Sequence, residues 1–178
     1  MGAELLEQTA KLAEGFPDVA KDIRINLQNV LTPAALNADQ VWGTAIACAH
    51  AARNDALKQA LEADARAAGI GDAVVADAKA AAVLMGLNNV FYRFKHVIGK
   101  EDYEKKPARL RMQRLSQITS NKADFELFCL AVSAINNCQS CMAAHEAAVL
   151  KQGLTEDHVI DSIRIAATVH AAAVAAEI

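Results

Sequence analysis

Three groups capable of dithiol chemistry lie close together near residue 140. Cys138 and Cys141 form a Cys-x-x-Cys pair, and His145 follows four residues after the second cysteine. The pair Asn136-Asn137 interrupts the apolar run that precedes them, and Asn is a preferred N-cap, so we expect a helix to begin here. On that helix Cys141 and His145 share one face, and Cys138 lies one turn before Cys141 on the same face.

This spacing suits a redox-active thiol. A helix N-terminus lowers the pKa of a thiol, and a nearby imidazole can accept its proton or pair with the thiolate. The dipole argument favours Cys138 as the attacking thiol, because it is nearer the N-terminus, whereas the i,i+4 spacing to His145 favours Cys141. A second thiol one turn away can condense with a sulfenic acid formed at the first.

An acidic residue upstream is a candidate third member of the site. Glu126 lies in the strongly apolar segment 123–132, and Glu is rarely buried without a partner. If this helix packs on the cysteine helix, Glu126 could orient His145, as the third group does in a nucleophile–base arrangement. The alternative is an exposed carboxylate paired with Lys122, four residues earlier. The residues alone favour neither interpretation.

The same residues also allow a metal-binding hypothesis. Cys138, Cys141 and His145 could supply three zinc ligands, but no fourth is obvious, and Glu126 would be unusual in a closed structural site. We therefore favour dithiol chemistry and expect no bound metal. The other two cysteines, Cys48 and Cys129, lie in apolar runs and are predicted to be buried and inert.

The composition favours one all-α domain over residues 1–178. The chain is 53% hydrophobic, with abundant alanine and only 4% aromatic residues, and strand signals are absent. Helical patterns and their breaks predict helices at 17–31, 38–53, 54–69, 72–85, 88–98, 122–135, 138–152 and 156–176. Residues 99–121 are expected to be a connector that carries a short helix.

A weak internal repeat has a spacing of 84 residues and would relate segments 36–85 and 120–169. Asn37, Ala47, Val75, Asp77 and Ala82 recur as Asn121, Ala131, Val159, Asp161 and Ala166. Duplication of a helical unit would explain these identities, and so would chance in alanine-rich helices. In a duplicated chain only the second copy carries the thiol pair.

Charge and hydropathy exclude several classes of function. The net charge of -3 and the pI of about 5.9 provide no electrostatic footprint for nucleic acid. Residues 1–7 are acidic and amphipathic, unlike a secretory signal, and the most apolar segment, 163–178, is too short to span a bilayer. We expect a cytoplasmic protein, and in a reducing compartment a close cysteine pair is more typical of catalysis or metal binding than of a static disulfide.

The arrangement Glu126-x11-Cys138-x2-Cys141-x3-His145 resembles the alkyl hydroperoxidase D (AhpD) family, part of the carboxymuconolactone-decarboxylase-like group of helical proteins. Three further segments look like parts of that family and extend the resemblance to nearly the full length: Met-Gly-Leu-Asn-Asn-Val-Phe-Tyr-Arg at 85–93, Trp-Gly-Thr at 42–44 and Lys-Asp-Ile at 21–23.

The resemblance implies an all-helical homotrimer with thiol-dependent peroxidase activity toward organic hydroperoxides. It implies no tightly bound cofactor, recharging by dihydrolipoamide on a lipoyl-bearing acyltransferase, and reduction of the peroxiredoxin AhpC. Carried over by residue, Cys141 becomes the sulfenic acid, Cys138 is the proton donor and resolving thiol, and Glu126 with His145 relays protons. The Cys138–Cys141 disulfide would be the oxidised state.

One position departs from the family pattern: Ser140 stands where some members carry histidine, so any role of that histidine has no counterpart at this position. Asn88, Asn89, Tyr92 and Arg93 are predicted to fix helix packing or a subunit contact. A redox adaptor without peroxidase turnover stays open as an alternative function. The thiol pair argues against a non-redox decarboxylase of the wider group.

Overall fold

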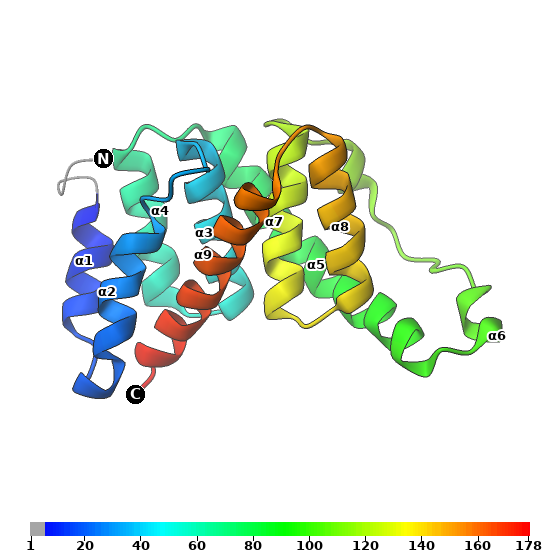
Figure 1. Cartoon of the computed structure of the whole chain (residues 1–178), viewed down its shortest axis with the longest axis horizontal. Coiled ribbons are helices and arrows are strands. Elements are labelled where there is room, and N and C mark those ends of the chain that lie inside the picture. Colours follow the sequence, from blue (N-terminus) through cyan, green and yellow to red (C-terminus); the bar gives the residue numbers. More distant parts are fainter. Residues whose placement is uncertain (1–5) are drawn as a thin grey trace.

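The computed structural model describes residues 6–178, and every regular element in that range is helical, which confirms the predicted all-α class (Figure 1). The α-helices are α1 (Glu7–Glu14), α2 (Lys21–Val30), α3 (Ala38–Ala52), α4 (Asp55–Ala67), α5 (Asp72–Ile98), α6 (Glu101–Glu104), α7 (Lys122–Ile135), α8 (Gln139–Lys151) and α9 (Glu156–Ala175). Short 3₁₀ turns lie at Asp18–Ala20 and Gln113–Ser116. Segment 1–7, which we do not expect to be a secretory signal, falls mostly outside the described residues.

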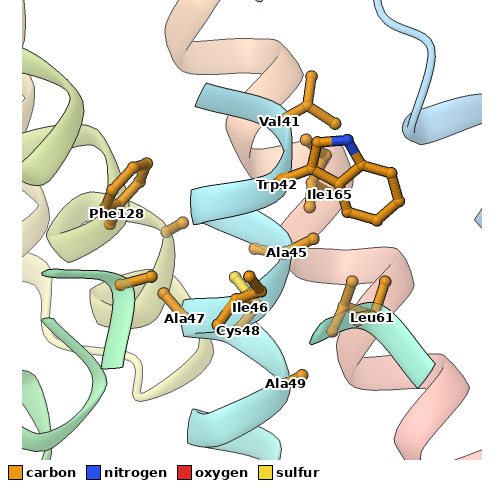
Figure 2. Close-up of a cluster of buried hydrophobic side chains, with 14 of the residues drawn as sticks. Val41, Trp42, Ala45, Ile46, Ala47, Cys48, Ala49, Leu61, Phe128 and Ile165 are labelled. Carbon is orange, nitrogen blue, oxygen red and sulfur yellow. The ribbon is translucent and has the colours of Figure 1, made fainter. Parts of the chain in front are cut away.

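The core is organised around α3, which packs against α5, α7 and α9. Its residues from Gln40 to Ala49 are all buried, so this helix is covered on every side (Figure 2). Gly43 allows α7 to approach closely, because a Cβ atom there would lie 2.1 Å from Cζ of the buried Phe128 ring. The low aromatic content is thus matched by close helix contacts built on small residues.

Helix α5 corrects one prediction, since it is a single helix and not two helices at 72–85 and 88–98. Gly86 lies inside it at an exposed position, and the Asn88 and Asn89 side chains that follow are buried. Burial of this segment holds it helical despite the propensity cost of the glycine, which is about 1 kcal/mol. The helix ends where Gly99 adopts a left-handed conformation with φ of 59°.

Because α5 is unbroken over its 27 residues, it is the one described helix whose length and composition would allow it to cross a membrane. Half of its apolar window is buried inside the fold, and a core helix passes the same test. The sequence prediction of two shorter helices concealed this property, because neither piece reaches a spanning length.

Two matching contacts join a carboxylate in each segment of the predicted repeat to the residue just before the other segment. Asp77 of α5 accepts a hydrogen bond at 2.9 Å from the backbone N–H of Thr119, just before α7. Asp161 of α9 accepts one at 3.2 Å from the backbone N–H of Ala35, just before α3. Both the carboxylates and the N–H groups are separated by the repeat spacing of 84 residues. On this basis we propose that the segments are copies of one helical unit.

Candidate active site

The turn between α7 and α8 places the thiol pair. Asn136 ends α7, Asn137 adopts a left-handed conformation with φ of 52°, and Cys138 is itself the N-cap of α8. The expectation of an asparagine cap is therefore wrong: both asparagines form the tight turn, and the Cys138 side chain makes no capping hydrogen bond. At the other end, Gly153 follows α8 with φ of 92°, as its position predicts.

A clamp from α5 holds this turn. Asn89 Nδ2 donates to Ser133 Oγ at 2.9 Å, and Asn136 Nδ2 donates to Asn89 Oδ1 at 2.9 Å. The Arg93 guanidinium donates to the Asn136 carbonyl oxygen, two residues before Cys138. Asn89 and Arg93 are i,i+4 neighbours and so share a face of α5. The predicted packing role is confirmed for these two residues.

Cys138 and Cys141 are joined by a disulfide, with a Cα–Cα distance of 5.3 Å. Cys138 is fully buried, whereas Cys141 is 7% exposed and lines a cavity. Within residues 6–178, Cys141 is therefore the sulfur of this pair that a molecule in the cavity meets. The geometry favours reaction with outside reagents at Cys141, against the order suggested by the helix dipole.

Glu126 and His145 form a close pair across α7 and α8. His145 Nδ1 lies 2.7 Å from Glu126 Oε2, and the side chains are 18% and 22% exposed, respectively. The alternative pairing of Glu126 with Lys122 is wrong for the described residues, where the carboxylate contacts the imidazole. A carboxylate on Nδ1 holds the proton of a neutral imidazole there, which leaves Nε2 as the ring's acceptor.

A cavity of about 270 Å³ lies between α5 and α8, next to Cys141. Its lining consists of Asn88, Tyr92, Ser140, Cys141, Ala144 and His145. The prediction that Asn88 and Tyr92 fix helix packing or a subunit contact did not anticipate their position beside Cys141. The signal that could have found it is their i,i+4 spacing, offset by one residue from the clamp formed by Asn89 and Arg93.

The remaining cysteines are buried, as predicted. Cys48 and Cys129 are free thiols with no exposed surface. Burial raises the pKa of Cys48. Burial, followed by the negative charge of Glu126, raises the pKa of Cys129 well above its usual value. Both thiols stay protonated near neutral pH and are unsuited to nucleophilic attack. Among residues 6–178, no group of three or more His, Cys, Asp or Glu side chains is arranged to hold a metal ion.

Comparison with known proteins identifies the family. The sequence profile of the Carboxymuconolactone decarboxylase family matches residues 101–177. An Alkyl hydroperoxide reductase AhpD from Anaeromyxobacter dehalogenans (strain 2CP-C) is 54% identical over 94% of this chain and 89% of its own length. Proteins of the same name from Rhodospirillum centenum and Brucella suis are 48% and 44% identical, over 89% and 93% of this chain and 84% and 94% of their own lengths. With such identity over most of its length, the chain belongs to the AhpD family.

Proposed function

We propose that the protein is a thiol-dependent peroxidase that reduces organic hydroperoxides through a dithiol–disulfide cycle at Cys138 and Cys141. The observation that carries the proposal is the cavity in which Cys141 lies beside His145, with Glu126 bonded to the imidazole and Cys138 bonded to Cys141. The relatives named alkyl hydroperoxide reductases support the substrate class.

In the proposed oxidative step, the Cys141 thiolate attacks the terminal oxygen of the hydroperoxide. The O–O bond breaks, the alcohol leaves with a proton, and Cys141 becomes a sulfenic acid. Cys138 supplies a proton and then its sulfur, releasing water as the disulfide forms. His145, oriented by Glu126, relays protons during both reactions. The burial of Cys138 supports its role as the resolving thiol, because no outside reagent reaches it.

We propose dihydrolipoamide on a lipoyl-bearing acyltransferase as the reductant, with no tightly bound cofactor, in the cytoplasm. An external dithiol would attack Cys141, the reachable sulfur, and the resulting mixed disulfide would be resolved by the second thiol of the reductant. The peroxiredoxin AhpC is proposed as a partner that accepts the same reducing equivalents. The basis for both partners is membership in the AhpD family.

We also propose that the protein is a homotrimer. The second half of α5 and the segment after it extend away from the helical bundle (Figure 1). Large apolar side chains there are more than a third exposed, a pattern typical of a subunit interface: Val90, Phe94, Val97, Tyr103 and Leu110. Sedimentation equilibrium measures the subunit number, and a monomer at micromolar concentration would contradict this proposal.

Turnover of cumene hydroperoxide with different reductants tests the proposed function. Dihydrolipoamide should sustain turnover, whereas glutathione and thioredoxin should not. Peptide mapping after one equivalent of peroxide should show the Cys138–Cys141 bridge, with the other two cysteines reduced. A thiol pair that stays reduced in hydroperoxide would overturn the proposal, and consumption that requires added AhpC would identify a redox adaptor instead.

A further inference from the structure

We propose that the side-chain amide of Asn88 binds the –OOH group of the hydroperoxide in the cavity next to Cys141. This inference rests on the proposed peroxidase function and assigns a substrate-binding residue to the same site. It begins from an unusual feature of the described residues: a polar side chain that lines the cavity and is almost fully buried has no partner there.

Two successive asparagines on α5 are used in opposite ways. Asn89 is fully buried, and both ends of its amide are hydrogen-bonded, to Ser133 and Asn136. Asn88 is only 8% exposed, yet within residues 6–178 its amide makes no hydrogen bond and its Oδ1 is buried without a donor. A buried polar atom without a partner destabilises a fold, so most such atoms are satisfied by protein, water or a ligand.

Asn88 lines the cavity, so a ligand bound there is the partner available to its amide N–H groups. Asn88 and Tyr92 form the α5 side of the cavity, and Cys141, Ala144 and His145 form its α8 side. A small molecule in this cavity therefore contacts the amide on one side and the reactive sulfur with the imidazole on the other.

The chemistry of an amide matches that of a hydroperoxide. An amide offers one carbonyl acceptor and two N–H donors, and a hydroperoxide offers one O–H donor and two oxygen acceptors. Asn88 Nδ2 can donate an N–H to the oxygen that carries the alkyl group, whereas Asn88 Oδ1 has almost no accessible surface and does not face the ligand. The methyl group of Ala144 and the ring of Tyr92 provide apolar surface for the alkyl chain.

This contact acts on the bond that breaks. As the S–O bond forms at Cys141, the O–O electron pair moves to the oxygen that carries the alkyl group, which takes a proton and leaves as the alcohol. Sulfur is oxidised by two electrons and the peroxide is reduced by two. An N–H of Asn88 directed at the leaving oxygen stabilises its developing negative charge, as an oxyanion-hole donor does.

The test separates the two half-reactions in the full-length protein. Asn88→Leu removes both polar ends but keeps the same number and branching of side-chain heavy atoms. We expect oxidation of the reduced protein by cumene hydroperoxide to slow by about 10²-fold, the lower end for the loss of one such donor. Reduction of the disulfide by dithiothreitol and alkylation of the reduced pair by iodoacetamide should change by less than about twofold, because neither needs that donor.

The stability of Asn88→Leu separates a binding role from a structural role, because loss of a structural contact would lower the unfolding midpoint. Asn88→Leu removes an unpaired buried group, so its unfolding midpoint should equal or exceed that of the wild type. The matched variant Asn89→Leu breaks the clamp and should unfold at a lower denaturant concentration. A large loss of stability in Asn88→Leu, with both half-reactions slowed, would mean that Asn88 serves packing and would overturn the inference.

Asn88→Ala is the control for the possibility that the leucine side chain slows oxidation by blocking the cavity. This variant enlarges the cavity, and its oxidation should still slow by at least about tenfold, a modest loss for an oxyanion donor. If the wild type is oxidised and Asn88→Ala is oxidised equally fast, the inference about Asn88 fails while the peroxidase proposal stands. If the wild type itself is not oxidised, the proposed function fails first.

Discussion

Replacing Glu126 by glutamine tests the proposed relay most directly. The change keeps the side-chain size and an acceptor oxygen but removes the negative charge 2.7 Å from His145 Nδ1. We expect hydroperoxide turnover to slow by about 10²-fold, which equals about 2.7 kcal/mol in the activation barrier. A hydrogen bond to a charged group contributes about 1.5–3 kcal/mol, and we take the upper part because both side chains are about four-fifths buried.

The assay is steady-state consumption of cumene hydroperoxide with saturating dihydrolipoamide. Glu146→Gln is the matched control: this residue follows His145 on α8, and within residues 6–178 its carboxylate makes no ion pair or side-chain hydrogen bond. Glu146→Gln removes one negative charge from α8, not from the α7 helix that carries Glu126, and leaves the Glu126–His145 pair in place, so it should turn over at the wild-type rate. His145→Phe alone should slow turnover by about 10²-fold, the lower end for a general acid–base group.

Combining the two changes decides whether the carboxylate acts through the imidazole. If it does, Glu126→Gln with His145→Phe should be no slower than His145→Phe alone, because the shared interaction is lost only once. A double variant slower by about 10⁴-fold, the product of the separate effects, would mean that Glu126 acts independently of His145. A folded Glu126→Gln protein with full turnover would refute the relay and make the carboxylate a surface group.

Three further predictions concern the thiols and the fold. With Cys141 as the attacking thiol, Cys138→Ser should form a sulfenic acid that dimedone traps, but it should not turn over. Cys141→Ser should give almost no dimedone adduct. The reverse labelling would make Cys138 the attacking thiol and Cys141 the resolving thiol. Burial favours the neutral form of Asp77, but hydrogen bonds from two backbone N–H groups and a guanidinium outweigh it and lower its pKa. Its contribution is therefore complete above an unfolded pKa of about 3.9 and is lost as pH falls through the lower folded value. Asp77→Asn should cost about 2 kcal/mol in urea unfolding at pH 7 and less at pH 3, and a pH-independent difference would contradict this. Gly43→Ala should destabilise the fold by about 1–3 kcal/mol, because its Cβ would overlap a buried phenylalanine ring. Gly86→Ala has nothing within 4 Å of its Cβ and should stabilise the fold by about 0.5–1 kcal/mol. If thermal melts show equal effects for the two variants, the clash at Gly43 is relieved.

Local signals in the sequence are enough to predict the helical class and most helix ends. Asn37, Asn54 and Asn121 each cap the helix that follows, accepting hydrogen bonds from backbone N–H groups two or three residues along the chain. Gly99 and Gly153 follow helix ends in the left-handed conformation. These interactions join atoms only a few residues apart, so the helix ends can be predicted from the local sequence. The thiol pair and its family resemblance are visible for the same reason.

Which side chains meet depends on how the helices pack against one another. The pairing of Glu126 with His145, and not with Lys122, depends on how α7 packs on α8. The same packing buries one sulfur of the pair and leaves the other at the cavity, and it places Asn88 beside that sulfur. The spacing of residues along a helix shows which of them share a face, but it does not show which face another helix covers. That choice depends on how side chains from distant parts of the chain fill the core together, and no short segment of sequence contains this information.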